Sequence, residues 1–453
     1  MTDSALDVLN KNISVIGAAL SGIAAARLLK RNGARVFLSE FAPQEQKSKE
    51  YVLLQNEKLE CEFGGHSDRA LQADWVVVSP GVPSDIPILR KLAVLKIPVY
   101  SEIEIASRFL RSPVIAVTGS NGKTTTTTLI GEICKKSGLN TIVAGNIGTP
   151  LSDVAESNSE NGIAVLEISS FQAERLTTFK PKVGILLNLS PDHMDRYSSV
   201  DEYYRAKRKT FEMQDAADYL IYNDDDGNVK NIIAGLGGTK VPFSLSRKLS
   251  NGCYLDGGRI MCQLEKEEEV ITTDRIGIIG KHNIYNAMAA ILAARLIHIP
   301  VPTIQRTLHE FRGVDHRLEF VKEIRGVRFY NDSKATNVDS TYVALESFTA
   351  EKIILIAGGK HKGSPYTPLR ELTKQKVKCL VLIGEAAPLI EKDMDGIVPA
   401  VRAKSMHEAV RKSFERATNG DVILLSPACS SYDMFKNYED RGNQFKQEIF
   451  QLN

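Results

Sequence analysis

The residues best suited to chemistry lie between positions 114 and 128, in the string VIAVTGSNGKTTTTT. The string opens with an apolar run that predicts a buried parallel strand. Gly119, Gly122, Lys123 and Thr124 follow, and a helix-compatible apolar segment comes next. A strand, a glycine-rich turn and a helix form the context of a phosphate-binding loop. In such a loop, backbone N–H groups surround an anion, the lysine supplies positive charge, and a hydroxyl can ligate Mg²⁺.

The spacing of this loop departs from the usual pattern GxxxxGK[ST]. Val117 holds the place of the first glycine. An ordinary glycine turn before a helix is the alternative interpretation. We favour the phosphate-binding loop because the strand, the Gly-Lys-Thr string and the helix all agree.

Two further strands end in side chains that could bind a metal. Residues 163–167 form an apolar run that ends in Glu167, and residues 183–187 lead into a loop that contains His193. Strands that alternate with helices predict a parallel sheet, in which the strand ends share one edge. Glu167 and His193 are therefore expected beside the phosphate-binding loop, and a carboxylate is a ligand that Mg²⁺ prefers. A solvated strand end and a structural histidine are the alternatives.

The first hundred residues read as a βαβ unit similar to a dinucleotide-binding fold. A strand over 12–16 is followed by the turn GAALSG, a helix and a strand over 36–38. Ala19 holds the second glycine position of the GxGxxG pattern, so a nucleotide ligand and a tight structural turn both remain open. A strand over 75–78 then leads into Ser79-Pro80-Gly81, which could be a plain loop.

The remaining segments continue the alternation of strands and helices. Residues 203–212 look helical and carry three basic side chains, which composition alone assigns to a solvated face. Asp224-Asp225-Asp226 reads as a loop, with a metal site as the alternative. Residues 250–273 alternate in polarity and predict antiparallel strands. A helix is expected after Gly280, and a third unit begins around Gly313, with polar residues after each strand.

Composition limits the class of protein. A chain of 453 residues suggests several domains, and 43% apolar with 25% charged residues is typical of soluble globular proteins. The net charge of +2 predicts no general attraction to nucleic acid or membranes. The 6 cysteines form no CxxC motif, and there is no signal pattern or membrane-length apolar run, so reduced thiols in the cytoplasm are expected.

Together these strings resemble the Mur ligases, ATP-dependent enzymes that form amide bonds in peptidoglycan precursor synthesis. The matching strings cover almost the whole chain in order: TGSNGKTT, Glu167 with SSFQ, DHMDRY, GKHN-x-x-N, Asp315-His316-Arg317, YNDSKATN and SPACSSYDMFKNYEDRG. DSKATN and SPACSS with KNYEDRGN favour the branch of the family that adds D-glutamate to UDP-N-acetylmuramoyl-L-alanine. The DNPR string of the diaminopimelate-adding branch does not occur.

The resemblance implies an α/β protein of three domains. A Rossmann-like domain over residues 1–101 would bind the UDP substrate. A central P-loop ATPase-type parallel sheet over 102–313 would bind ATP and Mg²⁺. A Rossmann-like α/β domain over 314–453 would bind the amino acid and ATP, and its closure would exclude water. A cytoplasmic monomer without nucleic-acid or membrane partners is expected.

The resemblance also assigns roles to individual residues. The expected ATP-binding residues are Gly119, Ser120, Asn121, Gly122, Lys123, Thr124, Thr125, Asn283, Arg317, Asp332 and Lys334. The expected ligands of two Mg²⁺ ions are Thr124, Glu167, His193 and a carbamylated Lys207. The expected catalytic residues are Lys123, Glu167, His193 and Lys207. The expected UDP-substrate residues are Leu20, Ser21, Glu40, Ser79 and Asn146. The expected D-glutamate residues are Thr336, Lys362, Ser431 and Tyr438.

The chain departs from the family pattern at a few positions. Lys207 aligns through Ala206 and Phe211-Glu212, and Lys209 is the alternative. Ala19 replaces a usual glycine, Phe41-Ala42 replaces a polar pair, and Tyr438 replaces a common phenylalanine. An aromatic face survives at position 438, but the diphosphate contacts of the first domain are affected.

The implied reaction joins two substrates at the expense of ATP. The alanyl carboxylate would attack the γ-phosphate, and the D-glutamate amine would attack the resulting acyl phosphate, with release of ADP and phosphate. A folylpolyglutamate synthetase-type ligase is one alternative, although it would normally lack the first unit. A P-loop protein that hydrolyses ATP without ligation is another. A purely structural role would leave Glu167, His193 and Lys334 unexplained.

Overall fold

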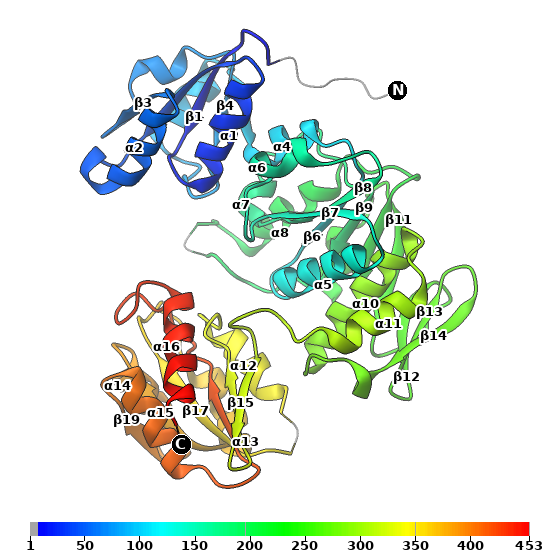
Figure 1. The fold of residues 1–453 in the computed structure, drawn as a ribbon, viewed down its shortest axis with the longest axis vertical. Coiled ribbons are helices and arrows are strands. Elements are labelled where there is room, and N and C mark those ends of the chain that lie inside the picture. Colours follow the sequence, from blue (N-terminus) through cyan, green and yellow to red (C-terminus); the bar gives the residue numbers. More distant parts are fainter. Residues whose placement is uncertain (1–7, 195, 349, 453) are drawn as a thin grey trace. The chain divides into compact units, whose positions relative to one another are not determined.

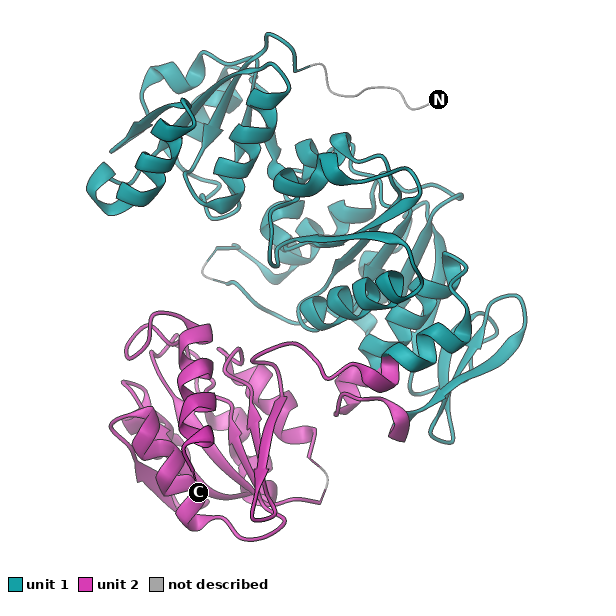
Figure 2. Cartoon of the chain, viewed as in Figure 1, with its two compact units in different colours: residues 1–273, 285–307 teal, residues 274–284, 308–453 magenta. Residues whose placement is uncertain are grey.

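The computed structural model describes residues 8–194, 196–348 and 350–452. The chain divides into two compact units, which are coloured separately in Figure 2. Unit 1 comprises residues 1–273 and 285–307, and unit 2 comprises residues 274–284 and 308–453. Each unit is built around parallel β-sheet (Figure 1), as the alternation of apolar runs and helical segments predicts.

The first sheet of unit 1 is parallel and has the strand order β3-β2-β1-β4-β5. Its strands are β1 (Asn12–Ile16), β2 (Arg35–Glu40), β3 (Glu60–Phe63), β4 (Trp75–Val78) and β5 (Val99–Ser101). Its helices are α1 (Leu20–Arg31), α2 (Ser48–Asn56) and α3 (Pro87–Val94). Apolar residues of α1 pack on one face, and those of α3 pack on the other, so both faces are buried.

The second sheet of unit 1 has nine strands in the order β14-β13-β12-β11-β10-β9-β6-β8-β7. They are β6 (Val114–Thr118), β7 (Asn140–Gly145), β8 (Gly162–Glu167), β9 (Val183–Leu186), β10 (Tyr219–Asn223), β11 (Thr239–Ser244), β12 (Gly252–Asp256), β13 (Arg259–Gln263) and β14 (Glu267–Thr272). Strands β6 to β12 pair in parallel, and β12, β13 and β14 pair antiparallel. The antiparallel strands predicted over 250–273 are therefore confirmed.

The helices that accompany the second sheet lie along the chain before its first strand, between its strands and after its last strand. They are α4 (Glu102–Ala106), α5 (Lys123–Lys136), α6 (Leu151–Val154), α7 (Ser170–Ala173), α8 (Val200–Arg208), α9 (Gly227–Ile232), α10 (Lys281–Leu296) and α11 (Val301–Glu310). The residues of α10 and α11 are divided between the two units. The helix predicted over 203–212 is α8 followed by a 3₁₀ turn, Lys209–Phe211.

Unit 2 contains the third sheet, with the strand order β15-β16-β20-β17-β18-β19. Its strands are β15 (Glu319–Ile324), β16 (Val327–Asn331), β17 (Ile353–Gly358), β18 (Val377–Ile383), β19 (Ala400–Arg402) and β20 (Val422–Leu425). Its helices are α12 (Val338–Glu346), α13 (Arg370–Lys376), α14 (Ala387–Asp393), α15 (Met406–Arg416) and α16 (Tyr438–Phe450). Only β15 runs antiparallel. Helices α12, α13 and α14 cover one face, and α15 and α16 cover the other.

The predicted fold class is confirmed, because three α/β sheets follow one another along the chain. The domain boundaries at residues 101 and 313 stay predictions. The solvated basic face expected from composition is wrong for Lys207, whose residue is 1% exposed. The six cysteines are free thiols. Within the described residues, no helix is both long enough and apolar enough to cross a membrane.

Candidate active site

The loop that is expected to bind phosphate lies between the carboxyl end of β6 and the first turn of α5, so the predicted order of strand, glycine turn and helix is confirmed. Gly122 caps α5 with φ of +84°, a left-handed conformation that favours glycine. A Cβ atom at this position would lie 2.4 Å from Oδ1 of Asn286. The loop therefore needs glycine for two reasons, its backbone conformation and its contact with α10.

Two asparagines outside the predicted set support this loop. Asn188 accepts from the Asn121 N–H at 2.8 Å through Oδ1, and its own carbonyl accepts from the Ser120 N–H at 3.0 Å. Asn286 faces Gly122. The sequence did carry a signal for both, because Asn188 follows the strand that precedes His193, and Asn286 is the second asparagine of GKHN-x-x-N.

Two lysines converge on one carbonyl of the loop. Nζ of Lys123 donates to the carbonyls of Gly119 and Ser120, both at 2.8 Å, and Nζ of Lys207 donates to the Gly119 carbonyl at 2.9 Å. Burial lowers the pKa of Lys207 well below its usual value, and the charge of Lys123 lowers it further. Asp192 and Glu167 act in the opposite direction. This environment favours a neutral amine at position 207.

The alternative residue, Lys209, has different surroundings. Its Nζ donates to the backbone carbonyl of Glu174 at 2.6 Å. The structure thus brings Lys207, and not Lys209, to the carbonyls of the phosphate-binding loop.

Glu167 lies at the carboxyl end of β8 and is buried. Its Oε1 accepts from Nδ2 of Asn146 at 2.7 Å. Its Oε2 is buried and has no hydrogen-bond partner within the described ranges. Such an oxygen fits a bound cation, because buried carboxylate oxygens otherwise find donors and because Mg²⁺ prefers oxygen ligands.

His193 lies beside the aromatic rings of Phe171 and Tyr203. It has φ of +57°, and its ring lies 4.8 Å from that of Phe171 and 6.1 Å from that of Tyr203, between centroids. Nζ of Lys207 lies 4.6 Å from the centroid of the Tyr203 ring, and the Tyr203 hydroxyl is 3.3 Å from Oγ of Ser120. Tyr203, which the sequence analysis did not single out, therefore links His193, Lys207 and the loop.

The predicted metal ligands do not form a cluster of acidic and imidazole groups alone. Over the ranges that the structure describes, no group of three or more His, Cys, Asp or Glu side chains is arranged to hold a metal. The predicted set has only two residues of these types, Glu167 and His193, and it completes its ligands with a threonine and a lysine. Asp195 of the DHMDRY string lies outside the described residues.

The acidic run at 224–226 lies outside the helices and strands, between β10 and α9, as expected for the predicted loop. Its carboxylates have separate partners: Asp224 accepts from Arg247 at 2.6 Å, Asp225 from the Leu245 N–H at 2.7 Å, and Asp226 from the Leu189 N–H at 2.8 Å. These contacts support the structural interpretation of the run.

The predicted UDP-substrate residues of the first sheet gather at the carboxyl ends of β1, β2 and β4. Oγ of Ser79 donates to the Gly17 carbonyl at 3.0 Å, and Glu40 accepts from the N–H groups of Ala18 at 2.6 Å and Ala42 at 2.8 Å. Leu20 is 77% exposed beside them. Because Glu40 occupies the Ala18 amide, that amide is not offered to a pyrophosphate as it would be in a dinucleotide-binding loop.

Asn146 is separate from these residues, because it directly follows β7 of the second sheet and donates to Glu167. Arg196 connects the first sheet of unit 1 to the segments that follow strands of the second sheet. Its guanidinium donates to the Pro80 carbonyl at 2.8 Å and to Glu174 at 3.3 Å. The loop that contains Ser79 is thereby tied to the segment that contains His193.

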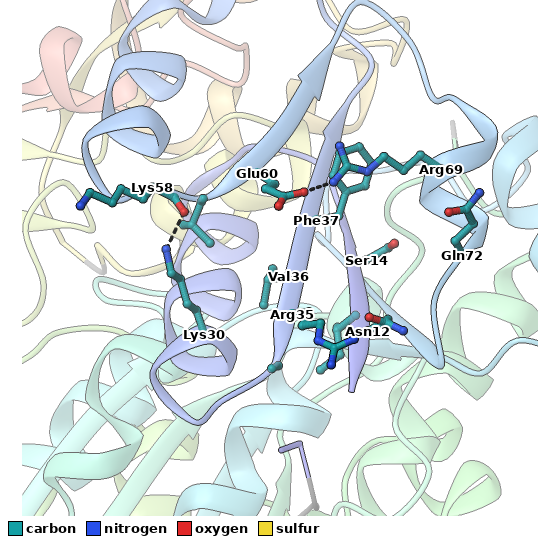
Figure 3. Close-up of a pocket in the computed structure, with 13 residues that line it drawn as sticks. Asn12, Ser14, Lys30, Arg35, Val36, Phe37, Lys58, Glu60, Arg69 and Gln72 are labelled. Carbon is teal, nitrogen blue, oxygen red and sulfur yellow. Dashed lines mark hydrogen bonds and ion pairs between the residues drawn. The ribbon is translucent and has the colours of Figure 1, made fainter. Parts of the chain in front are cut away.

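The first sheet also borders a cavity of about 500 Å³. The cavity lies at the amino ends of β1, β2 and β3, and Figure 3 shows Arg69 over the ring of Phe37 and paired with Glu60. None of the predicted UDP-substrate residues lines it. In a parallel sheet the ligand edge is the carboxyl edge, so this cavity is not the predicted substrate site.

Unit 2 gathers the predicted residues that follow β16. Asp332 accepts from Oγ of Ser426 at 2.7 Å and from the Leu318 N–H at 3.2 Å. Burial raises the pKa of Asp332 to about 7, although its hydrogen bonds and the charge of Arg317 oppose the shift. Nζ of Lys334 lies 5.3 Å from the centroid of the Tyr438 ring.

The predicted D-glutamate residues lie on neighbouring loops of unit 2. The Lys360 N–H donates to the Ser430 carbonyl at 2.9 Å, which joins the loop of Lys362 to the loop of Ser431. Thr336 follows Lys334, and its N–H donates to the Lys334 carbonyl at 2.8 Å. Asn283 also belongs to unit 2, where its Nδ2 donates to the Ile279 carbonyl at 2.7 Å.

Arg441 organises these loops and was given no role from the sequence. It is fully buried, and its guanidinium donates to Oγ and O of Ser333 at 3.0 and 2.7 Å and to the carbonyls of Cys429 and Ser430 at 3.1 and 3.3 Å. Its place in KNYEDRGN was the available signal. One side chain thus holds together the strings DSKATN and SPACSS.

Comparison with protein families finds matches along most of the chain. Residues 12–87 match the MurD N-terminal domain, residues 117–294 match the Mur ligase middle domain, and residues 316–429 match the Mur ligase glutamate ligase domain. Their order is the order of the three sheets.

Curated relatives match over the full length. A UDP-N-acetylmuramoylalanine--D-glutamate ligase from Chloroherpeton thalassium is 42% identical over 465 residues, covering 98% of this chain and 99% of the relative. One from Pelotomaculum thermopropionicum is 43% identical over 450 residues, with the same coverage of 98% and 99%.

Among solved structures, a pseudomurein peptide ligase type C from Methanothermus fervidus has a TM-score of 0.61 at 19% identity, covering 98% of this chain and 100% of that one. At this identity the likeness shows the fold. The family models and the full-length relatives show more: this chain belongs to the Mur ligase family.

Proposed function

We propose that this chain is an ATP-dependent ligase that adds D-glutamate to UDP-N-acetylmuramoyl-L-alanine in peptidoglycan precursor synthesis. The alanyl carboxylate is activated as an acyl phosphate, and ADP and phosphate are released. The observation that carries the proposal is the similarity at 42–43% identity, over 98% of the chain, to ligases of that name.

The triphosphate of ATP is held by the loop from Gly119 to Thr125. Lys123 compensates the phosphate charge, and its present bonds to two loop carbonyls keep the ammonium at the loop. Asn283, Arg317, Asp332 and Lys334 of unit 2 are proposed as further ATP-binding residues. The conformation of Gly122 and the two asparagines that support the loop favour this assignment, because a fixed loop binds an anion without reorganisation.

Thr124, Glu167, His193 and a carbamylated Lys207 hold two Mg²⁺ ions. When bound, Mg²⁺ neutralises the charge that develops on the transferred phosphoryl group. The orphaned Oε2 of Glu167 suits one such ion. The lowered pKa of Lys207 favours the neutral amine, which can add CO₂ and release a proton to give an anionic carbamate.

The two substrates are bound by residues of different sheets. Leu20, Ser21, Glu40 and Ser79 hold the uridine diphosphate portion, and Asn146 holds the muramoyl portion. Thr336, Lys362, Ser431 and Tyr438 hold D-glutamate. Lys362 and Ser431 offer donors to its carboxylates, which is the chemistry that a dianionic amino acid requires.

A coupled assay of ADP release tests the proposal. ADP should form only when ATP, UDP-N-acetylmuramoyl-L-alanine and D-glutamate are all present, and a panel of D- and L-amino acids should show preference for D-glutamate. ADP release that is independent of the amino acid would instead indicate an ATP-hydrolysing switch. Preference for a folate substrate would indicate the folylpolyglutamate-type alternative.

The chain further acts as a cytoplasmic monomer in this proposal. Free cysteines, most of them buried, suit a reducing compartment. Light scattering coupled to gel filtration should give a mass near 50.0 kDa, and a mass near twice that value would overturn the monomer.

A further inference from the structure

The loop between Gly359 and Tyr366 carries Lys362 on an exposed stretch. Residues 362–365 are all exposed, and Gly363, with φ of +85°, has open space around the position of a Cβ atom. A lysine on such a stretch has many conformations. Ordering it on binding would cost affinity unless the loop is restrained beforehand.

Tyr366 closes this loop and is rigidly placed. It is 2% exposed and packs in the core under α12, α13 and α14. Its N–H donates to Oδ2 of Asp393 at 2.9 Å, at the end of α14. The ring is therefore a buried anchor for the exposed segment before it.

The Tyr366 hydroxyl connects two loops. It lies 2.9 Å from Nδ1 of His361 and 3.0 Å from Sγ of Cys429. A phenolic hydroxyl both donates and accepts, so one proton arrangement satisfies both neighbours. Burial raises the pKa of the Cys429 thiol, which keeps it protonated, although its hydrogen bond to Tyr366 and the charge of Lys362 act in the opposite direction.

We infer that the hydrogen-bonded chain His361–Tyr366–Cys429 positions Lys362 against Ser431 for the capture of the D-glutamate carboxylates. His361 precedes Lys362 directly, and Cys429 stands two residues before Ser431. The inference rests on the proposed D-glutamate site. In it, His361 and Tyr366 are positioning residues that do not touch the substrate.

Backbone hydrogen bonds bring the two loops side by side as far as Lys360 and Ser430, among the contacts of the described residues. The Gly358 N–H donates to the Pro427 carbonyl at 2.9 Å, and Lys360 pairs with Ser430. Beyond Lys360, the side-chain bonds through Tyr366 are what hold the segment of Lys362 to the Cys429 loop. Their loss should therefore affect the amino-acid substrate and leave ATP binding and chemistry alone.

The Tyr366→Phe variant tests the inference, because it keeps the ring in the core and removes only the hydroxyl. KM for D-glutamate should rise about three- to tenfold, as expected for the loss of one or two hydrogen bonds, while kcat and KM for ATP stay within about twofold. An unchanged KM for D-glutamate, or a loss confined to kcat, would overturn the inference.

The His361→Ala variant provides a second route, because His361 lies at the loop and not in the core. It should raise KM for D-glutamate by a similar factor. The double variant should be no worse than either single one, since both remove the same connection. Additive effects in the double variant would overturn the inference.

Two control variants distinguish this inference from a general loss of stability and from a failure of the proposed D-glutamate site. Tyr254→Phe removes a buried hydroxyl that bonds to Glu267 in the β12–β14 region, and it should lower the unfolding midpoint without changing KM. Lys362→Ala should raise KM for D-glutamate more than Tyr366→Phe does. If Lys362→Ala leaves KM unchanged, the proposed D-glutamate site falls, and the inference with it. If only Tyr366→Phe leaves it unchanged, the inference falls alone.

Discussion

The side-chain amide of Asn146 donates to Glu167 across 2.7 Å, although the two residues lie on different strand ends. This bond occupies one carboxylate oxygen and leaves the other, Oε2, buried without a donor. It also joins a residue expected at the muramoyl portion of the substrate to one expected at the metal. Replacing either residue should therefore alter both the muramoyl-binding position and the metal-binding position.

Replacing Glu167 with glutamine should remove the metal-binding charge and keep the fold. The amide oxygen can still accept from Asn146, but the second atom becomes an uncharged NH₂ group. We expect kcat to fall about a hundredfold or more. The Mg²⁺ concentration that gives half-maximal activity should rise. A Mg²⁺ titration of ADP release measures both. Glu160→Gln, at an exposed position of the same unit, is the control, and an unaltered Mg²⁺ dependence in Glu167→Gln would contradict the metal assignment.

Truncation to alanine should abolish activity at Lys207 but not at Lys209. Lys207→Ala should be inactive because it loses the anionic group proposed for the metal site. Short carboxylic acids such as formate or acetate should restore part of its activity by filling the space. Lys209→Ala should keep most activity, since its Nζ bonds only to the Glu174 carbonyl among the contacts described. Absence of rescue at every acid concentration would leave the carbamate unsupported.

Lys123→Ala should abolish amide formation, because the γ-phosphate loses its charged partner in the loop. The product assay and an ATP-binding titration measure the effect. Lys135→Ala removes an exposed lysine of the same helix, which pairs with Glu132 at 3.1 Å, and should stay near full activity. Near-normal turnover of Lys123→Ala would refute the assignment of the phosphate-binding loop.

Two glycines with similar backbone conformations should differ sharply on substitution. Gly122→Ala adds a Cβ atom 2.4 Å from Oδ1 of Asn286, whereas Gly138 has φ of +88° and nothing within 4 Å. Both variants bear the cost of a left-handed alanine, about 1 kcal/mol. Only Gly122→Ala should also weaken ATP binding, by about tenfold or more. Equal ATP affinities in an isothermal titration would show that the contact with Asn286 is unimportant.

Glu102 should make the stability of the chain depend on pH. It is buried in α4, accepts from the Ser152 N–H at 2.6 Å through Oε1, and has no partner for Oε2 in the described structure. Burial raises its pKa from 4.5 to about 7. Between these values the folded chain keeps a proton that the unfolded chain has lost, so the free energy of unfolding falls as pH rises.

Glu102→Gln should remove this dependence, because glutamine cannot ionise. At pH 8 the variant should be more stable than the parent by at most about 3 kcal/mol, and near pH 4.5 the two should be similar. Urea unfolding followed at both pH values measures the difference. An equal increment at the two values would show that Glu102 does not titrate between them.

The sequence alone predicted the three α/β sheets and the strings that match the family. The strands β6, β8, β17 and β20 are continuous apolar runs, because both faces of a parallel sheet are buried. The turn between β6 and α5 was predictable because its strand, glycines, lysine and helix are adjacent in the chain. Apolar runs and adjacent motif residues are local features of the chain, so a single sequence is enough to identify them.

Only the tertiary structure decided which distant residues meet and which charges are buried. The segment VDEYYRAKR of α8 looks like a solvated helix, yet Lys207 is 1% exposed and bonded to Gly119. Likewise, Arg441 reaches Ser333, and Tyr366 reaches Cys429. These contacts join residues far apart in sequence, and they depend on the order in which the strands pair. The energy of a buried side chain is set by the neighbours that this pairing supplies, and a linear pattern of residue types does not contain them.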